Sequence, residues 1–408
     1  MTRGKWWWVG GGLTLGLMAW IFYDTPLTQE VKTVLDQPDM FDASPDNGFL
    51  LMVGLGHQDP QSVGQRWVAD AQQRVDDAKA PSSNTAAWST LADPPPVLAL
   101  KSEAGQALTC DARQFNCFEV DRFAAAAPDL LPLIENLIGQ YQAMLAAPRY
   151  VEYADHIRRL GLDAPVPAMS GLNLAQSAFH ARLRGLQKHD LGPALLQERL
   201  GLIKLMRGST TLISKMITAN MALKHLWVVH DAIKAGRVPA AADRSQLTSL
   251  FDEATFSLEQ PLRTEMLGQL RIYQFVMHGQ GQSTNNSEFL APLRAVYQHA
   301  VYKPNDTINR AYRAFQSINA VQPQLPNVAP EAAPASWVFN PMGGILLSVA
   351  HADFTSYRLR IGDVNRLQSG LNQCRAGSAT TVTMAVKFEA KTTDKLKPRL
   401  REGNQLVC

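Results

Sequence analysis

The chain has 408 residues, of which 46% are hydrophobic and 18% are charged, and its formal net charge is +3. This composition excludes a disordered chain, because disorder needs few hydrophobic residues and a high charge. The charges nearly balance, and no basic block is interleaved with aromatic residues, which argues against a nucleic-acid partner. We therefore expect a folded protein that binds neither DNA nor RNA.

An apolar segment without charge occupies residues 6–23. As a helix rising about 1.5 Å per residue, it would be roughly as long as one hydrocarbon core is thick. It ends in the bulky residues WIFY rather than in a small-residue cleavage site, and Arg3 and Lys5 precede it while acidic residues follow. The pattern predicts a retained single-pass transmembrane helix with a cytoplasmic N-terminus and an exported body; a cleaved signal peptide is the alternative.

Gly12 and Gly16 form a G-x-x-x-G spacing inside this apolar segment. Small residues at that spacing let two membrane helices approach closely and associate. The spacing therefore raises the hypothesis of a homodimer formed through the membrane helix.

Four cysteines fit an oxidising, exported environment. Four cysteines allow three pairings, and the sequence does not decide between them. Proximity along the chain favours the pairs Cys110 with Cys117 and Cys374 with Cys408. Cysteine pairs with the tight spacing of a zinc site are absent.

Two stretches rich in proline, alanine and serine, residues 79–98 and 321–336, are typical of linkers or surface excursions. They divide the chain into contiguous blocks. The predicted blocks are a cytoplasmic N-terminus and anchor at 1–23, a stalk, linker and cysteine loop at 24–128, a helical core at 129–320, a proline-rich linker at 321–336, and a C-terminal part at 337–408.

The clearest helical pattern runs from Ser209 to Ala235, where Ser209 or Thr210 can cap the start and Gly236 can end the helix. Apolar residues recur along it at alternating spacings of four and three, which predicts one buried stripe. The stripe contains Leu212, Met216, Ala219, Leu223, Leu226, His230 and Ile233.

The preceding segment repeats that spacing at Leu196, Leu200 and Ile203, which makes it a packing partner. Similar patterns lie at 129–146, 259–277 and 286–301. Several amphipathic helices in succession predict a mainly α protein with bundle-like packing.

The C-terminal part combines a helix and a strand. Asn340-Pro341 is typical of a helix start, and a helical stripe continues to Cys374. From Val382 to Phe388 the apolar period changes to two, which predicts a half-buried strand. Residues 404–408 are its expected partner, so we predict a small C-terminal β-hairpin in an otherwise helical fold.

Histidine and glutamate side chains are candidate metal ligands and catalytic groups. His225 and His230 share one predicted helix, but a separation of five residues places them about 140° apart, so they cannot hold one metal ion together. His230 lies in the apolar stripe and is expected to be a core histidine, with Asp231 solvated beside it.

Four glutamates lie in predicted helices, and a solvated helix face is the expectation for each. They are Glu135, Glu198, Glu253 and Glu265. The sequence contains no metalloprotease, nucleophile-elbow or P-loop motif. We therefore predict no metal and no cofactor, and the catalytic residues, if the protein is an enzyme, stay unknown.

Asn340, Gly343 and Gly344 offer the remaining candidate site. Backbone amides at a helix start can bind an anion, and these residues belong to such a start. The alternative is a tight turn that only leads into the helix.

Four stretches resemble a group of uncharacterised proteobacterial envelope proteins. They are NGFLLMVGLG at 47–56, the Cys110 and Cys117 pair, KMI at 215–217, and FNPMGGILL at 339–347. The resemblance implies a bacterial source, a single N-terminal span and a helical periplasmic body. It implies no activity and no catalytic residue.

Together these expectations describe an inner-membrane protein whose periplasmic domain acts as a non-catalytic binding or scaffold subunit, with a protein or an envelope component as partner. Two alternatives stay open. One is an envelope enzyme acting on cell-wall or lipid material, and the other is a binder of apolar ligands.

Overall fold

The structure is a computed structural model, and it describes residues 22–36, 41–78, 131–160, 167, 170–238, 247, 252–279, 296–297, 299–320, 339–350, 355–373, 379–382 and 404–407. Helices account for 79% of them, which confirms the mainly α class. By its contacts the chain forms two compact units. Unit 1 comprises residues 1–38, 157–164 and 262–355, and unit 2 comprises residues 39–156, 165–261 and 356–408.

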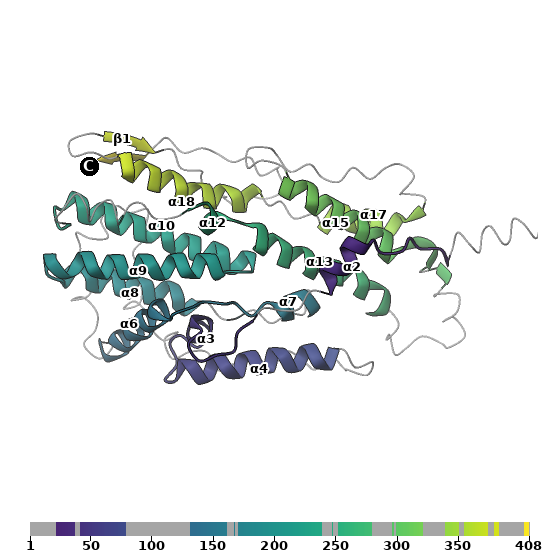
Figure 1. The fold of residues 1–408 in the computed structure, drawn as a ribbon, viewed down its shortest axis with the longest axis horizontal. Helices are drawn as coiled ribbons and strands as arrows, with labels where there is room; N and C mark the ends of the chain where they lie inside the picture. Colours follow the sequence, from purple (N-terminus) through teal and green to yellow (C-terminus); the bar gives the residue numbers. More distant parts are fainter. Residues whose placement is uncertain are drawn as a thin grey trace, which may run out of the picture. The chain divides into compact units, whose positions relative to one another are not determined.

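Unit 2 contains most of the described helices (Figure 1). They are α3 (Gly48–Val53), α4 (Pro60–Ala78), α6 (Leu131–Ala146), α8 (Ser170–Gly185), α9 (Lys188–Gly208), α10 (Leu212–Lys234), α12 (Glu253–Phe256) and most of α18 (Thr355–Gln373). Helix α6 packs on α8 and α9, while α9 also packs on α10. This arrangement brings four helices together around one point.

Helix α10 begins where Thr211 accepts a hydrogen bond from Ser214 N at 3.2 Å, and it ends before Gly236, whose φ is +65°. The positive φ explains the glycine, since other residues rarely adopt it. The single buried stripe predicted for this helix is too narrow, because α10 lies between two apolar clusters. Met221 and Val228 belong to the first cluster, and Met216 and Leu226 belong to the second.

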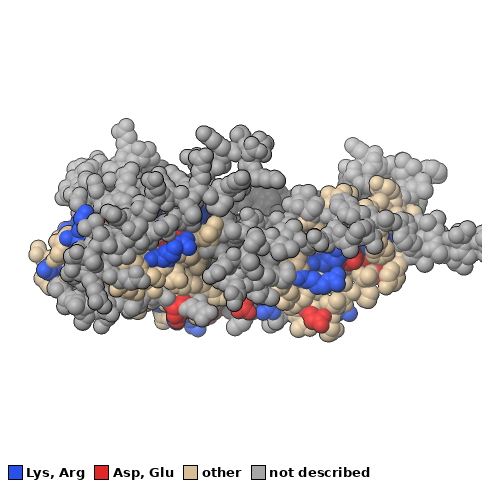
Figure 2. Space-filling model, turned by 90° about the horizontal axis from the view of Figure 1, so that it is seen from above, with Lys and Arg blue, Asp and Glu red and all other residues tan. Residues whose placement is uncertain are grey.

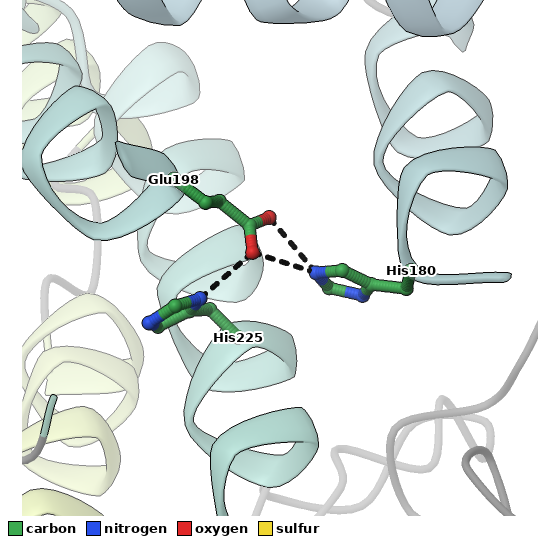
Figure 3. Close-up of side chains that lie close together, drawn as sticks. All are labelled: His180, Glu198 and His225. Atoms are coloured by element: carbon green, nitrogen blue, oxygen red, sulfur yellow. Dashed lines mark hydrogen bonds and ion pairs between the residues drawn. The ribbon is translucent and has the colours of Figure 1, made fainter. Parts of the chain in front are cut away.

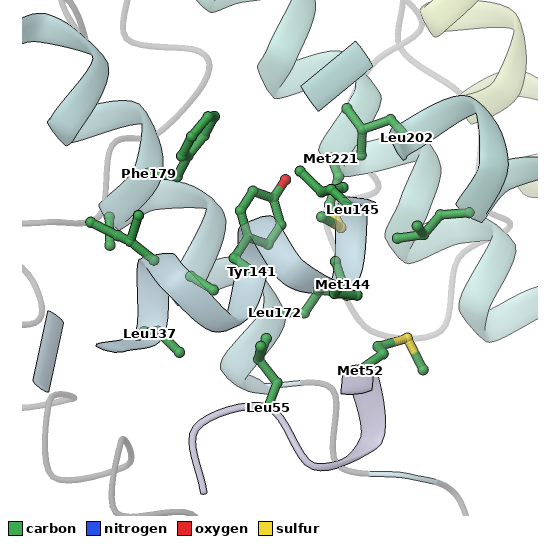
Figure 4. Packing of buried hydrophobic residues seen from close by; sticks show 14 of the residues in the cluster. Met52, Leu55, Leu137, Tyr141, Met144, Leu145, Leu172, Phe179, Leu202 and Met221 are labelled. Carbon is green, nitrogen blue, oxygen red and sulfur yellow. The ribbon is translucent and has the colours of Figure 1, made fainter. Parts of the chain in front are cut away.

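The first apolar cluster fills the space between α3, α6, α8, α9 and α10. Figure 4 shows Tyr141 among the surrounding apolar side chains, including Phe179 and Leu145. Helices α6 and α9 approach closely where Gly201 faces Leu145. A Cβ added at Gly201 would lie 2.7 Å from Leu145 Cβ and 3.0 Å from its Cα, so a larger residue there would force the helices apart.

The segment NGFLLMVGLG forms α3 and the turn after it. Asn47 caps α3 by accepting from Phe49 N at 3.1 Å, and its Nδ2 donates to Val151 O at 2.8 Å. Gly54 lies against the backbone of Pro60, without space for a side chain. Gly54 therefore allows close backbone packing between the end of α3 and the start of α4.

Unit 1 contains α2 (Gln29–Leu35), α15 (Pro304–Ala320), α17 (Pro341–Ala350), and most of α7 (Asp155–Leu160) and α13 (Glu259–Gly279). Helix α15 packs on α2 and α17. Asp24 caps α15 by accepting hydrogen bonds from Asn305 N at 2.8 Å and Asp306 N at 3.1 Å. The predicted helical block at 129–320 therefore supplies helices to both units.

The prediction of a transmembrane helix is wrong for the part of the chain that the structure describes, where no helix is both long and apolar enough to cross a bilayer. Of the apolar segment at 6–23, the structure describes Phe22 and Tyr23. Their rings contact His299 and Phe339 at centroid distances of 5.7 and 6.4 Å. These two residues therefore pack against other residues of unit 1.

The β-hairpin predicted from the sequence is not supported. Strand β1 (Ala379–Val382) pairs antiparallel with β2 (Asn404–Val407), with Ala379 opposite Val407. The predicted strand, whose alternation runs from Thr381 to Glu389, shares Thr381 and Val382 with β1, and the rest of it lies outside the described residues.

The predicted disulfides find no support either. All four cysteines, Cys110, Cys117, Cys374 and Cys408, lie outside the described residues, among which no disulfide is present. Gly12 and Gly16 also lie outside them, so membrane-helix dimerisation stays a hypothesis.

Lysine and arginine side chains form small groups, with aspartate and glutamate between them, on the face of the molecule shown in Figure 2. Mixed signs of this kind are typical of a solvated surface. A buried cluster of ionisable side chains lies inside unit 2.

Candidate metal centre

The carboxylate of Glu198 is the centre of a buried polar cluster in unit 2. Glu198 lies on α9 and has an exposed fraction of 0%. His180 on α8 and His225 on α10 point ring nitrogens at its carboxylate (Figure 3). His180 Nε2 lies 2.8 Å from Oε1 and 3.0 Å from Oε2, and His225 Nδ1 lies 2.7 Å from Oε2.

Two uncharged donors hold the same carboxylate from other directions. The Tyr141 hydroxyl on α6 donates to Oε1 at 2.9 Å, and Gln176 Nε2 on α8 donates to Oε1 at 3.1 Å. Gln176 Nε2 also donates to Met221 O at 2.9 Å, which fixes the orientation of the amide. Each polar group therefore comes from a helix whose apolar face packs in the first cluster.

The electrostatics of the cluster favour the ionised carboxylate. Burial by itself raises the pKa of Glu198, but the facing His180 and His225 outweigh it and hold the pKa well below its ordinary value. Burial, followed by the charge of Glu198, raises the pKa of Tyr141 well above its ordinary value. Tyr141 is therefore a neutral donor beside an anion.

Two buried atoms at the cluster have no hydrogen-bond partner among the described residues. They are His225 Nε2 and Gln176 Oε1. Buried polar atoms are nearly always satisfied by protein, water or a bound group, so orphaned atoms mark a place where a partner can be added.

The three side chains fit a transition-metal ion by their chemistry. His180, Glu198 and His225 each offer one ligand atom, and these atoms lie within 4.8 Å of one another. Two imidazoles and one carboxylate form a common ligand set for Zn²⁺ and related ions. Tetrahedral ligands at about 2.0–2.2 Å from zinc lie roughly 3.3 Å apart. The histidine nitrogens lie 2.7 to 3.0 Å from the Glu198 oxygens, so these distances would lengthen by a few tenths of an ångström.

Sequence reasoning named two of these three residues but did not bring them together. Glu198 was expected on a solvated helix face, which is wrong because Glu198 is fully buried. His225 was excluded only from sharing one ion with His230, and the ligand set contains His225 without His230. The error at Glu198 arose because the buried face of α9 differs from the predicted one. Leu200, placed in the predicted apolar stripe, is 55% exposed, whereas Leu195 and Leu202, which flank Glu198 on the opposite side, are fully buried.

His180 was not singled out at all. A signal did exist, because Glu198 interrupts an apolar stripe that holds at the spacing of a buried helix face, and a charged residue inside such a stripe needs a partner. That stripe contains Leu191, Leu195, Leu202 and Leu205, all fully buried.

His230 is buried, as expected, and its Nδ1 lies 3.3 Å from Asp231 Oδ1. The expectation that Asp231 is solvated is wrong, because Asp231 is also buried in α10. Glu135 is half-exposed and pairs with Arg182 at 2.8 Å, as a surface residue. Glu253 lies in α12 and Glu265 lies in α13. Neither glutamate belongs to the ligand set of the cluster.

Asn340 caps the start of α17 with its own side chain. Its Oδ1 accepts from Gly343 N at 3.0 Å and from Lys303 N at 3.0 Å. Asn340 is fully buried, and Thr307 Oγ1 and the Asn340 amide fill the space next to Gly343. The amide expected to bind an anion is already occupied, while Gly344 lies one residue further into the helix.

No protein-family model, curated protein or solved structure matches this chain. The resemblance to uncharacterised envelope proteins therefore stays a prediction from the motifs that suggested it. The function has to be inferred from the chemistry of the buried cluster.

Proposed function

We propose that this chain is a non-catalytic metal-binding protein, in which unit 2 holds one divalent transition-metal ion between His180 Nε2, the Glu198 carboxylate and His225 Nδ1. One observation carries the proposal. Three ligand atoms from three helices lie within 4.8 Å of one another, in a site where Glu198 and His225 are fully buried.

The charge of the cluster supports a cation. An ionised carboxylate in the interior is costly unless a positive charge compensates it. The Tyr141 hydroxyl and the Gln176 amide donate hydrogen bonds to Glu198 but leave its charge in place. A divalent ion between the three side chains would compensate it.

A second candidate is a metal-free ion cluster in which one histidine carries a proton. The short distances between the histidine nitrogens and the Glu198 oxygens, from 2.7 to 3.0 Å, favour it, since these are hydrogen-bond lengths. Metal stoichiometry separates the two candidates.

The burial of the site supports a structural role for the ion. Glu198 and His225 are fully enclosed, so a substrate has no direct access to their ligand atoms. Ions in closed sites contribute folding free energy by joining elements of the chain. This supports the scaffold or binding role expected from the sequence over an envelope enzyme; the envelope location, the partner and the apolar-ligand alternative stay predictions.

The test is metal stoichiometry of the full chain. Because the site is closed, the protein is refolded from denaturant with Zn²⁺ or Co²⁺, dialysed, and analysed by elemental mass spectrometry. We expect one ion per chain in the wild type, and loss of that ion in His180→Gln and Glu198→Gln.

Two variants serve as matched controls. Glu152→Gln changes another buried carboxylate, and His230→Gln changes another buried histidine on α10, and neither lies in the ligand set. Both should keep the ion. His180 is the side chain at the rim of the cluster, with 9% exposed, so its variant should fold and circular dichroism can confirm it. A wild type without metal, or full stoichiometry in His180→Gln, would refute the proposal.

A further inference from the structure

The two oxygens of the Glu198 carboxylate have different surroundings. Oε1 accepts from the Tyr141 hydroxyl at 2.9 Å and from Gln176 Nε2 at 3.1 Å. Oε2 accepts from neither of them and lies 2.7 Å from His225 Nδ1. His180 Nε2 lies near both oxygens, 2.8 Å from Oε1 and 3.0 Å from Oε2. Both uncharged donors therefore lie on one oxygen of the carboxylate, and His225 lies on the other.

We infer that Tyr141 and Gln176 are positioning residues that make Glu198 bind the metal through Oε2 alone, and that this selects a nitrogen-preferring ion of the zinc class over calcium, magnesium or manganese. The inference rests on the proposed metal site. It goes beyond that site by assigning a role to two side chains outside the ligand set and by naming the class of ion.

The selection follows from the lone pairs of the carboxylate. An ionised carboxylate has about four lone-pair positions, two on each oxygen. Tyr141 and Gln176 donate to Oε1. His180 Nε2 also lies 2.8 Å from Oε1, but as a metal ligand it would direct its lone pair at the ion, so the two uncharged donors would keep Oε1 and leave Oε2 for the ion. Calcium takes about 6–8 oxygen ligands and often both oxygens of a carboxylate, whereas two imidazoles with one carboxylate oxygen suit tetrahedral zinc.

Both donors are held rigidly enough to impose this geometry. Gln176 Nε2 uses its two protons on Glu198 and on Met221 O, so a turned amide would face two acceptors with an oxygen. Tyr141 is fully buried, with its ring 5.6 Å from the ring of Phe179 between centroids. Hydrogen bonds to a ligating carboxylate of this kind are known to tune metal affinity.

Three protein ligands leave the fourth position of a tetrahedral ion for a water molecule. Gln176 Oε1 is a buried acceptor at the cluster without a partner among the described residues, and such a water molecule would need an acceptor of this kind.

The test compares the wild type with the double variant Tyr141→Phe, Gln176→Leu, both as full chains refolded with Co²⁺. We expect the intense visible absorption of four-coordinate Co²⁺ in the wild type. The double variant frees Oε1 for the ion, so its absorption should weaken as the coordination number rises. Its preference for Zn²⁺ over Mn²⁺ in competition dialysis should fall by about 10- to 100-fold.

Tyr150→Phe is the matched control. Tyr150 is a buried tyrosine of the same cluster of apolar residues, but its hydroxyl donates to the Met52 sulfur at 3.0 Å. This variant should keep the wild-type spectrum and preference.

The possible results are distinguishable. Metal bound to the double variant with an unchanged spectrum and an unchanged zinc preference would overturn the inference and leave the proposed metal site standing. A wild type that binds no Co²⁺ would overturn the proposed function, and this inference with it.

Discussion

Two buried glutamates of unit 2, Glu198 and Glu152, have opposite electrostatic surroundings. Glu198 faces imidazoles on two neighbouring helices, while Glu152 faces the start of α10. Glu152 accepts from Thr210 N at 2.7 Å and Thr211 N at 2.9 Å, and the Thr211 and Ser214 hydroxyls donate to its other oxygen. Both side chains are at most 3% exposed, so burial does not distinguish them.

The pKa values move in opposite directions. Burial raises the pKa of Glu152, and the hydrogen bonds from Ser214, Thr211 and the backbone lower it without cancelling the rise. At Glu198, His180 and His225 reverse the effect of burial and hold the pKa well below its ordinary value. The comparison teaches that partners able to carry positive charge, more than the number of donors, decide whether a buried carboxylate stays ionised.

We expect the largest loss in the free energy of unfolding from Glu198→Ala. The change leaves two histidines, a tyrosine and a glutamine without their common acceptor. Removing one partner of a buried ion cluster costs about 3–5 kcal/mol. Urea unfolding of the metal-free protein, followed by circular dichroism, measures the loss, and a cost under about 1 kcal/mol would show that the cluster is not ionic.

A smaller effect is expected from Glu152→Ala. Its donors are hydroxyls and amides at a helix start, where water can replace part of the carboxylate. Loss of a helix cap and of buried hydrogen bonds costs about 1–3 kcal/mol. The same unfolding experiment should rank Glu152→Ala below Glu198→Ala; the reverse order would contradict the electrostatic distinction between the two sites.

The smallest effect concerns the pH dependence of the two glutamine variants without metal. A depressed pKa at Glu198 gives stability that is present above the unfolded pKa of about 4.3 and is lost as the pH falls. The cost of Glu198→Gln should therefore be lower at acid pH than at neutral pH.

The opposite trend is expected for Glu152→Gln. A raised pKa gives stability that is present below the unfolded pKa and is lost as the pH rises, so this variant should cost more at acid pH. Each trend is limited to about 1.4 kcal/mol per pH unit. Free energies of unfolding measured across the acid range test these opposite trends. Parallel trends for the two variants would contradict the prediction.

The helical class and the bounds of α10 were accessible from the sequence, because capping residues and a terminal glycine are local signals. The predicted end at Ala235 and Gly236 agrees with the structure, and the start differs by one or two residues from the observed cap at Thr211. Local signals also placed α6 and α13 close to their observed bounds.

The polar cluster at Glu198 could not be predicted from local signals. Its residues come from three helices, and their meeting depends on which face of each helix is buried. The stripe through Leu200 placed the wrong face of α9 inside, and this error turned Glu198 into a surface residue. A pattern of period 3.6 can be drawn through more than one face of a helix with many apolar residues.

The motifs that suggested a family have structural roles where they are described. Asn47 and Asn340 each cap a helix and join it to a distant segment. Lys215 of KMI is buried, and its Nζ donates to Met206 O and Thr255 O at 2.7 Å each. Burial lowers its pKa to about 8. The described residues of these motifs therefore stabilise the fold. His180, Glu198 and His225 lie outside the motifs.

The close approach between Gly201 and Leu145 constrains which residues can occupy these two positions while Tyr141 still donates to Glu198. Gly201 is three residues from Glu198 on the same face of α9, and the helix it touches, α6, carries the tyrosine that donates to that glutamate. A related sequence with a side chain at position 201 would need a smaller residue at position 145 to retain the tyrosine contact. Positions 201 and 145 should therefore covary, and lineages that break the rule should also have lost the tyrosine.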